Sequence, residues 1–310
     1  MRTNTKKRLL LTGAGGFLGW NICHCPQQEW EIIGCVHVRT PQLPGVITVK
    51  ADLTDSAALR ALFREARPDA VIHAAAIADP NTCQLNAGDA RRVNVDASIA
   101  IAELCADAAI PCVFTSTDLV FDGRNPPYNE DAEPCPVNCY GEQKALAEKE
   151  MRRRWPRVSV CRLPLMFGAS GPLGRNHLFG LVQALREGRQ VRLFTDEIRS
   201  TADAADVASG LFLALQEQPP LLHLGGPEPV SRYAFGIAVA RIIGAPAALL
   251  LPTRQAEVTM PAPRPPDVTF DNSRAFALGY RPARIAAALH RLLADQARHD
   301  EPTGHRASGR

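Results

Sequence analysis

Short apolar segments alternate with longer amphipathic segments through the first half of the chain. Six segments have the length and apolar content of buried strands: Arg8–Thr12, Glu31–Val38, Val46–Lys50, Ala70–His73, Pro111–Thr115 and Val158–Leu163. Four longer segments between them predict helices: about Gly16–Cys25, Ser56–Glu65, Ala87–Ala109 and Tyr140–Arg154. Because strands that alternate with helices form a parallel sheet covered on both faces, the pattern predicts an α/β fold with a doubly wound sheet.

The regular alternation ends after Leu163, where glycine and proline become frequent. Within this half, Ala202–Gln216 predicts a helix and Leu221–Leu224 a strand, so we expect the chain to return once to the main sheet. We therefore predict a larger domain at residues 1–168, rejoined at about 202–226, and a smaller C-terminal domain at 169–201 and 227–298. The polar tail, residues 299–310, is predicted to be disordered.

Composition excludes several classes of protein. The chain has 310 residues, a net charge of +3 and basic and acidic residues interspersed, so no basic patch for nucleic acid is expected. It has no apolar run long enough to span a membrane. Nine scattered cysteines favour reduced thiols in a cytoplasmic protein. Cys23-His24-Cys25 diverge around a helix and do not supply four ligands, so no metal site is predicted.

A glycine-rich loop follows the first predicted strand. It reads Gly13-Ala14-Gly15-Gly16-Phe17-Leu18-Gly19, with Gly13, Gly16 and Gly19 in a GxxGxxG spacing. Such glycines permit a tight turn, let the backbone approach a pyrophosphate and allow close packing of helix on strand, while the helix N-terminus offers free N–H groups. The loop therefore predicts a dinucleotide site in a Rossmann-like domain.

The end of the second predicted strand indicates which dinucleotide. An enzyme that uses NAD usually has an acidic residue there for the ribose hydroxyls. This chain reads Cys35-Val36-His37-Val38-Arg39-Thr40 instead. Arg39 can pair with a 2′-phosphate, so NADP is the preferred cofactor and NAD remains an alternative.

A tyrosine and a lysine stand four residues apart on a predicted helix. Among four tyrosines, Tyr140 alone has a lysine, Lys144, at this spacing, which places both side chains on one helix face. A nearby ammonium favours the ionised phenol, so Tyr140 can exchange protons near neutral pH. Thr117, in a hydroxyl cluster at the C-terminal end of the fifth strand, can hydrogen-bond the substrate oxygen that Tyr140 protonates.

With these motifs the sequence resembles the extended short-chain dehydrogenase/reductases, and among them the dTDP-4-dehydrorhamnose reductase group. The resemblance rests on the glycine loop, Asp52-Leu53, His73–Ala76, Val93-Asn94, Ser116–Gly123, Tyr140 with Lys144, and Arg162–Gly168. It implies that Thr117, Tyr140 and Lys144 form a catalytic triad. It also implies that the cofactor is bound by the residues Gly13, Gly16, Phe17, Leu18, Gly19, Arg39, Asp52, Leu53, Ala74, Ala75, Ala76, Tyr140 and Lys144.

The resemblance further implies a substrate and an assembly. A nucleotide-activated 4-keto-6-deoxy sugar is the expected substrate, with Arg199 facing its diphosphate. A homodimer is a possible assembly. A sugar-nucleotide epimerase would use the same residues. Similarity to the regulatory beta subunit of methionine adenosyltransferase, carried by Asn125–Tyr128 and Pro136–Asn138, keeps open a non-catalytic NADP-binding subunit.

Overall fold

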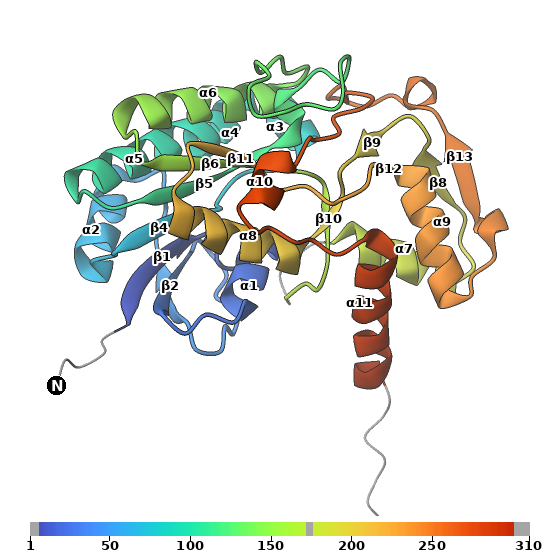
Figure 1. Ribbon diagram of the computed structural model, residues 1–310, viewed down its shortest axis with the longest axis horizontal. Coiled ribbons are helices and arrows are strands. Elements are labelled where there is room, and N and C mark those ends of the chain that lie inside the picture. The colour runs from blue at the N-terminus through green and yellow to red at the C-terminus, as the bar shows by residue number, and fades with distance from the viewer. Residues whose placement is uncertain (1–5, 172–175, 301–310) are drawn as a thin grey trace, which may run out of the picture.

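The computed structural model describes residues 6–171 and 176–300 (Figure 1). The predicted C-terminal tail lies outside these residues apart from its first two, with which the last helix ends. The nine cysteines, all among the described residues, are free thiols. Within the described ranges, no helix has the length and apolar character needed to cross a bilayer.

A seven-stranded parallel sheet forms the centre of the larger part of the molecule. Its strands are β1 (Lys7–Thr12), β2 (Trp30–Val36), β3 (Ile47–Lys50), β4 (Ala70–His73), β5 (Cys112–Thr117), β6 (Val158–Leu163) and β11 (Leu221–His223). They lie in the order β11-β6-β5-β4-β1-β2-β3. The direction of winding reverses between β1 and β4, the position at which open α/β sheets bind ligands. The prediction of a doubly wound α/β fold is confirmed.

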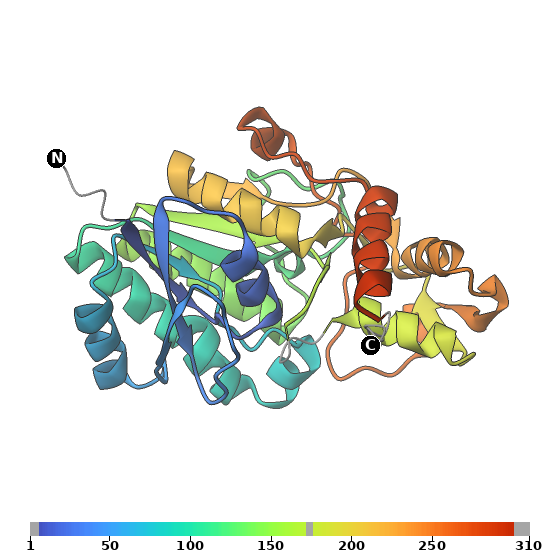
Figure 2. The ribbon, with the colours of Figure 1, turned by 90° about the horizontal axis from the view of Figure 1, so that it is seen from below.

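Helices cover both faces of this sheet (Figures 1 and 2). One face carries α1 (Phe17–His24) and α8 (Ala204–Glu217), which bury the side chains of Leu9, Leu11 and Ile72. The other carries α2 (Ser56–Ala66), α5 (Ala97–Asp107) and α6 (Cys139–Arg154), which pack on Leu10, Val71 and Phe114. Consecutive residues of β1 therefore serve opposite cores, which explains its unbroken leucine run.

The helix predicted over Ala87–Ala109 is interrupted. The chain forms α3 (Pro80–Leu85) and α4 (Ala87–Arg91), then one π-helical turn at Arg92–Asp96, and continues as α5. The extra residue of a π turn shifts the faces of the helix, and such turns are common at functional sites. Here the turn carries Asn94, whose side chain is fully buried.

The second part of the molecule lies beside the sheet (Figure 2). It has its own apolar core. Its main elements are β7 (Met166–Phe167), α7 (His177–Arg186), β8 (Val191–Phe194), β9 (Ile198–Arg199), β10 (Ala202–Asp203), β12 (Val230–Ser231), α9 (Arg232–Ile243), β13 (Leu250–Thr253) and α11 (Ile285–Asp300). The short helix α10 (Ser273–Ala277) lies instead beside β11 and packs into the core of the main sheet. Strands β8 and β13 pair in parallel, and β9 pairs with β12 in antiparallel fashion. The segment Arg199–Asp203 leads from this part back to the sheet, so Arg199 lies near both.

Candidate active site

A cavity of about 470 Å³ lies at the carboxyl ends of β1, β2 and β4. Its lining includes eight of the predicted cofactor residues: Gly13, Gly16, Arg39, Asp52, Leu53, Ala74, Ala75 and Ala76. Phe17, Leu18 and Gly19 form the first turn of α1 beside it. The loops that follow β1 and β4 thus meet at the reversal point of the sheet, as a dinucleotide site requires.

Two glycines make this close meeting of loops feasible. Gly13 has a φ of +72°, and a Cβ on it would lie 2.8 Å from the backbone nitrogen of Ala75. A Cβ on Gly19 would lie only 2.1 Å from the carbonyl oxygen of Gly13. No side chain caps the N-terminus of α1 at Gly16, so its first N–H groups are available to an anion.

A buried hydrogen-bond chain holds the two loops together. The Thr12 hydroxyl oxygen accepts from the backbone N–H groups of Ala74 and of the next residue, at 3.2 Å each, so its proton points to His73 Nδ1, 2.7 Å away. His73 Nε2 then donates to Ser98 Oγ at 2.9 Å. Burial lowers the pKa of His73 to about 3, and Lys144 adds to this effect. The imidazole is therefore neutral and fixed in one tautomer.

Arg39 and Asp52 lie at the outer end of this cavity. Strand β2 ends at Val36, two residues earlier than predicted, so Arg39 belongs to an exposed loop. Asp52 Oδ2 lies 3.7 Å from His37 Nε2. Hydrogen bonds from Thr54 lower the pKa of Asp52, which therefore supplies a carboxylate near the rim although none follows β2 directly.

Thr117, Tyr140 and Lys144 come from β5 and α6 and are not among the residues that line this cavity. Asn138 caps α6 through its bond to Gly141 N, and the next turns carry Tyr140 and Lys144, which are 7% and 1% exposed. Thr117, the last residue of β5, hydrogen-bonds Tyr140. The Lys144 ammonium lies 3.9 Å from the centre of the Phe114 ring.

Burial changes the proton affinities that the sequence suggested. It raises the pKa of Tyr140 above its ordinary value, with Cys83 and Asp118 acting in the same direction and Thr117 opposing them. Burial also lowers the pKa of Lys144 to about 7. Burial is the largest cause of both pKa shifts, and the predicted effect of Lys144 on the phenol stays a prediction.

Asn94 and Gln143 join the π turn to α6. Asn94 Nδ2 donates to Gln143 Oε1 at 2.9 Å, and its side chain also makes two hydrogen bonds with the backbone of Ile77. Gln143 Nε2 donates to the carbonyl oxygen of Ala87 at 3.0 Å. Ile77 packs against Tyr140 and lines the cofactor cavity, so these bonds connect the cavity with the tyrosine.

Next to Thr117, a buried ion pair joins the two parts of the molecule. Arg199 Nη1 lies 3.3 Å from Asp118 Oδ2, and both residues are 3% exposed. Neither atom makes a well-aligned hydrogen bond within the described ranges. Arg199 Nη2 donates to Glu197 Oε1 at 3.2 Å, and Thr117 Oγ1 donates to Asp118 Oδ1 at 3.2 Å. Arg199 thus contacts Asp118, the residue that follows Thr117 of the predicted triad.

Two further arginines interact electrostatically with this pair. Burial lowers the pKa of Arg232 and of Arg264, Glu197 opposes this effect in both, and Arg199 reinforces it. Arg199 thus lies against the carboxylates of Asp118 and Glu197, Glu197 also acts on Arg232 and Arg264, and Asp79 acts on Arg264 as a third carboxylate. Buried guanidinium nitrogens without a hydrogen-bond partner in the described residues, Nη1 of Arg199 and of Arg232, suit an anionic ligand that supplies acceptors.

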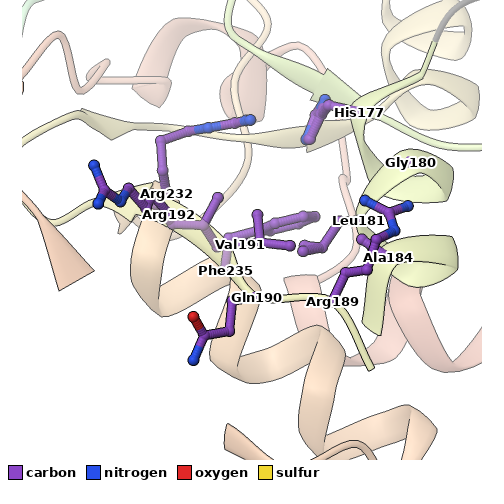
Figure 3. A pocket seen from close by; sticks show the side chains of 11 residues that line it. His177, Gly180, Leu181, Ala184, Arg189, Gln190, Val191, Arg192, Arg232 and Phe235 are labelled. Atoms are coloured by element: carbon purple, nitrogen blue, oxygen red, sulfur yellow. The ribbon is translucent and has the colours of Figure 1, made fainter. Parts of the chain in front are cut away.

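A second cavity, of about 390 Å³, continues beyond Arg232 (Figure 3). Leu181, Val191 and Phe235 form apolar parts of its wall. The guanidinium of Arg232 is directed toward the ring of His177. Arg232 Nη1 and His177 Nε2 are shielded from solvent and have no hydrogen-bond partner in the described part of the chain. The cavity thus combines apolar walls with two unpaired nitrogens, a common design for an aromatic polar ligand.

The sequence predicted the cofactor loop, the triad and Arg199 as site residues, but not the other residues of the charged cluster. Asp118 stands next to Thr117 in the same motif, and its charged side chain at that position was the signal that could have identified it as a site residue. Arg232, Arg264 and His177 belong to no local motif and come together only through the fold. The chain has thirty arginines, so the sequence alone gives no reason to select Arg232 and Arg264 among them.

The sheet is doubly wound, a glycine loop follows β1, and the helix that carries Tyr140 and Lys144 lies next to Thr117, the last residue of β5. Together these features define the extended short-chain dehydrogenase/reductases as the class of protein. The family model described as "RmlD substrate binding domain" matches residues 7–298. The chain therefore belongs to the RmlD substrate-binding-domain family, which confirms the resemblance inferred from the sequence.

Individual relatives agree with this assignment. The chain is 31% identical to the probable low-salt glycan biosynthesis reductase Agl14 of Haloferax volcanii, over 82% of this chain and 86% of the relative. It is 30% identical to methionine adenosyltransferase 2 subunit beta of Xenopus laevis, over 89% and 84%. The crystal structure of dTDP-4-dehydrorhamnose reductase from Bacillus anthracis in complex with NADP superposes with a TM-score of 0.84 and 21% identity, covering 94% of this chain and all of that one. At that identity it shows a common fold.

Proposed function

We propose that the protein is an NADP(H)-dependent reductase of a nucleotide-activated 4-keto-6-deoxy sugar, similar to dTDP-4-dehydrorhamnose reductase. One observation carries the proposal: the buried proton donor Tyr140 is joined through Thr117 and Asp118 to Arg199, the first residue of an arginine cluster. A proton donor suits a carbonyl group, and buried arginines suit a diphosphate. A sugar nucleotide carries a carbonyl group and a diphosphate, separated by the length of one sugar ring.

The cofactor cavity fits a dinucleotide phosphate. Substituents on Gly13 or Gly19 would collide with neighbouring backbone, and the uncapped start of α1 offers N–H groups to a pyrophosphate. Arg39, at the rim, suits a 2′-phosphate. When bound, the nicotinamide supplies the hydride.

The chain's own residues perform the proton transfer. Tyr140 gives its proton to the oxygen of the sugar carbonyl as that oxygen gains negative charge. Thr117 orients the oxygen by a hydrogen bond from its hydroxyl, whose proton turns to the substrate from Asp118 Oδ1. The Lys144 ammonium stabilises the phenolate that remains, and the apolar neighbours of Tyr140 exclude water from it.

The second part of the molecule, residues 169–201 and 227–298, is proposed as the substrate-binding domain. Arg199 and Arg232 bind the diphosphate, whose oxygens supply acceptors for the Nη1 atoms that lack a hydrogen-bond partner in the described residues. The nucleoside occupies the cavity of about 390 Å³ next to Arg232, between its apolar walls and His177.

Steady-state oxidation of NADPH tests the proposal, with a panel of 4-keto-6-deoxy nucleotide-sugars as substrates. Tyr140→Phe removes the proton and little volume, so we expect a loss of about 10²–10⁴ in kcat with cofactor affinity retained. Tyr280→Phe is the matched control, because the Tyr280 hydroxyl is buried without a hydrogen-bond partner in the described residues and lies outside the site. Equal rates for the parent and Tyr140→Phe contradict the assigned role.

Similarity to methionine adenosyltransferase 2 subunit beta supports a second candidate, an NADP-binding subunit without turnover. Such a subunit needs the cofactor cavity, and it has no need of a buried arginine cluster beside Tyr140. We therefore prefer the reductase. The two candidates differ in whether the purified chain alone consumes NADPH.

A further inference from the structure

Tyr140, Lys144 and Glu148 occupy successive turns of the buried face of α6. Their spacing of four residues places each side chain one turn from the next, and all three are at most 7% exposed. The proposed reaction uses the first two. Glu148 has no part in it, although a carboxylate this deeply buried requires a specific set of partners.

Glu148 is held from two neighbouring strands. Ser116 Oγ of β5 donates to Glu148 Oε1. Arg162 of β6 makes a bidentate contact, with Nε at 3.1 Å from Oε1 and Nη2 at 2.8 Å from Oε2. Phe114, two residues before Ser116 on the same face of β5, contacts Lys144. The strand therefore fixes Lys144 and Glu148 side by side.

His223 holds the side of the Arg162 guanidinium that does not contact Glu148. His223 Nδ1 lies 3.1 Å from the carbonyl oxygen of Tyr128, so Nδ1 carries the proton and Nε2 is left as an acceptor. Arg162 Nη1 lies 3.5 Å from this Nε2. Burial lowers the pKa of His223 to about 3, so the imidazole is neutral and adds no charge. Arg162 cannot turn away from Glu148 without losing this contact.

Lys144 faces few charged groups. His73 of β4 and Cys83 of α3 interact with it electrostatically, as does Glu148 on its own helix. Burial holds the pKa of His73 at about 3 and raises that of Cys83 to about 11, so both are uncharged at neutral pH. In the described part of the chain, Glu148 is therefore the anion that acts on Lys144.

From this arrangement we propose that Glu148 is a positioning residue that sets the charge of Lys144, and that Arg162 limits this effect by sharing the same carboxylate. The buried set Lys144, Glu148 and Arg162 carries two positive charges and one negative charge. One carboxylate cannot neutralise both cations, and both of its oxygens accept hydrogen bonds from Arg162. The inference rests on the proposed function for the role of Lys144, and its test does not depend on turnover.

The proposal predicts opposite effects for two variants. Glu148→Gln removes the anion and keeps an acceptor for Ser116, so the pKa of Lys144 falls by about one unit or more. Arg162→Met removes the competing cation, so the whole carboxylate acts on Lys144 and its pKa rises by a similar amount. A purely structural role would disturb the site in both variants without opposite signs.

Nuclear magnetic resonance of protein labelled on lysine measures this directly. The chain has five lysines, and the Lys144 signal is identified by its absence in Lys144→Met. We expect a titration midpoint near 7 in the parent. Glu150→Gln is the matched control, since Glu150 lies on the same helix but pairs with Arg153 and Arg154 away from the site. Its Lys144 midpoint should equal that of the parent.

The double variant Glu148→Gln/Arg162→Met covers the case in which either single variant does not fold, because it removes both buried charges together. Its midpoint should lie below that of the parent. A Lys144 midpoint that stays unchanged in the variants that lack Glu148, or that moves in the same direction in both single variants, overturns the proposal. Failure of every keto sugar as substrate would instead refute the reductase and leave the titration result standing.

Discussion

One methyl group added at Gly19 tests how closely the helix packs on the loop of the proposed cofactor site. Gly19→Ala places a Cβ 2.1 Å from the carbonyl oxygen of Gly13, whereas ordinary carbon–oxygen contacts are about 3.3 Å or longer. Both sides of the contact are backbone, so the helix and the loop must separate by about 1 Å. Overpacking of this kind costs about 1–3 kcal/mol.

The displaced segment is the loop proposed to bind the pyrophosphate, so cofactor affinity should fall with stability. Loss of one charge-assisted hydrogen bond corresponds to about 1.5–3 kcal/mol, or at least a tenfold weaker NADPH Kd. Urea unfolding and fluorescence titration with NADPH measure the two effects. Gly88→Ala is the control, because Gly88 lies in α4 with open space around it, and alanine there should stabilise by about 0.5–1 kcal/mol. If Gly19→Ala matches the parent in both measurements, the close packing of loop and helix is not required.

Three further variants test separate parts of the site. Arg39→Ala should reduce the preference for NADPH over NADH by about tenfold, and equal Kd values for both cofactors in the parent would contradict an NADP site. Thr117→Val should lower kcat by about 10² with the NADPH Kd unchanged, and an undiminished kcat would exclude its hydroxyl from the reaction. His73 has a folded pKa of about 3 against 6.5 when unfolded, so between these values the unfolded state binds the extra proton and stability falls as pH falls. His73→Gln should remove about 1.4 kcal/mol per pH unit of this slope in urea unfolding at pH 4.5–6, and an unchanged slope would show that the buried imidazole is charged.

Local patterns were sufficient to predict the sheet and its cofactor loop. Parallel strands buried on both faces are apolar throughout, so β1 and β4 are visible in the sequence, and the loop after β1 keeps its glycines because backbone lies against them. The π turn was not predicted, because Arg92–Asp96 continues an ordinary helical pattern. The end of β2 was placed two residues too late, since Val38 is apolar but exposed.

The charged part of the site depends on long-range contacts. Arg199, Arg232 and Arg264 are separated by more than thirty residues from one another along the chain and meet only where the second part of the molecule faces the sheet. The spacing of Tyr140 and Lys144 correctly placed them on one helix face. Their proton affinities could not be derived from that spacing, because they depend on burial by residues from several other elements.

Transfer of labelled hydride tests the central claim most directly. The purified chain, with no other protein present, is supplied with deuterium-labelled NADPH and a 4-keto-6-deoxy nucleotide-sugar, and the product is examined by mass spectrometry. The account predicts one deuterium on the former carbonyl carbon for each NADPH consumed, and none with Tyr140→Phe. Absence of labelled alcohol with every keto sugar, together with tighter association of a second protein when NADP is added, would contradict the reductase and favour a cofactor-binding subunit.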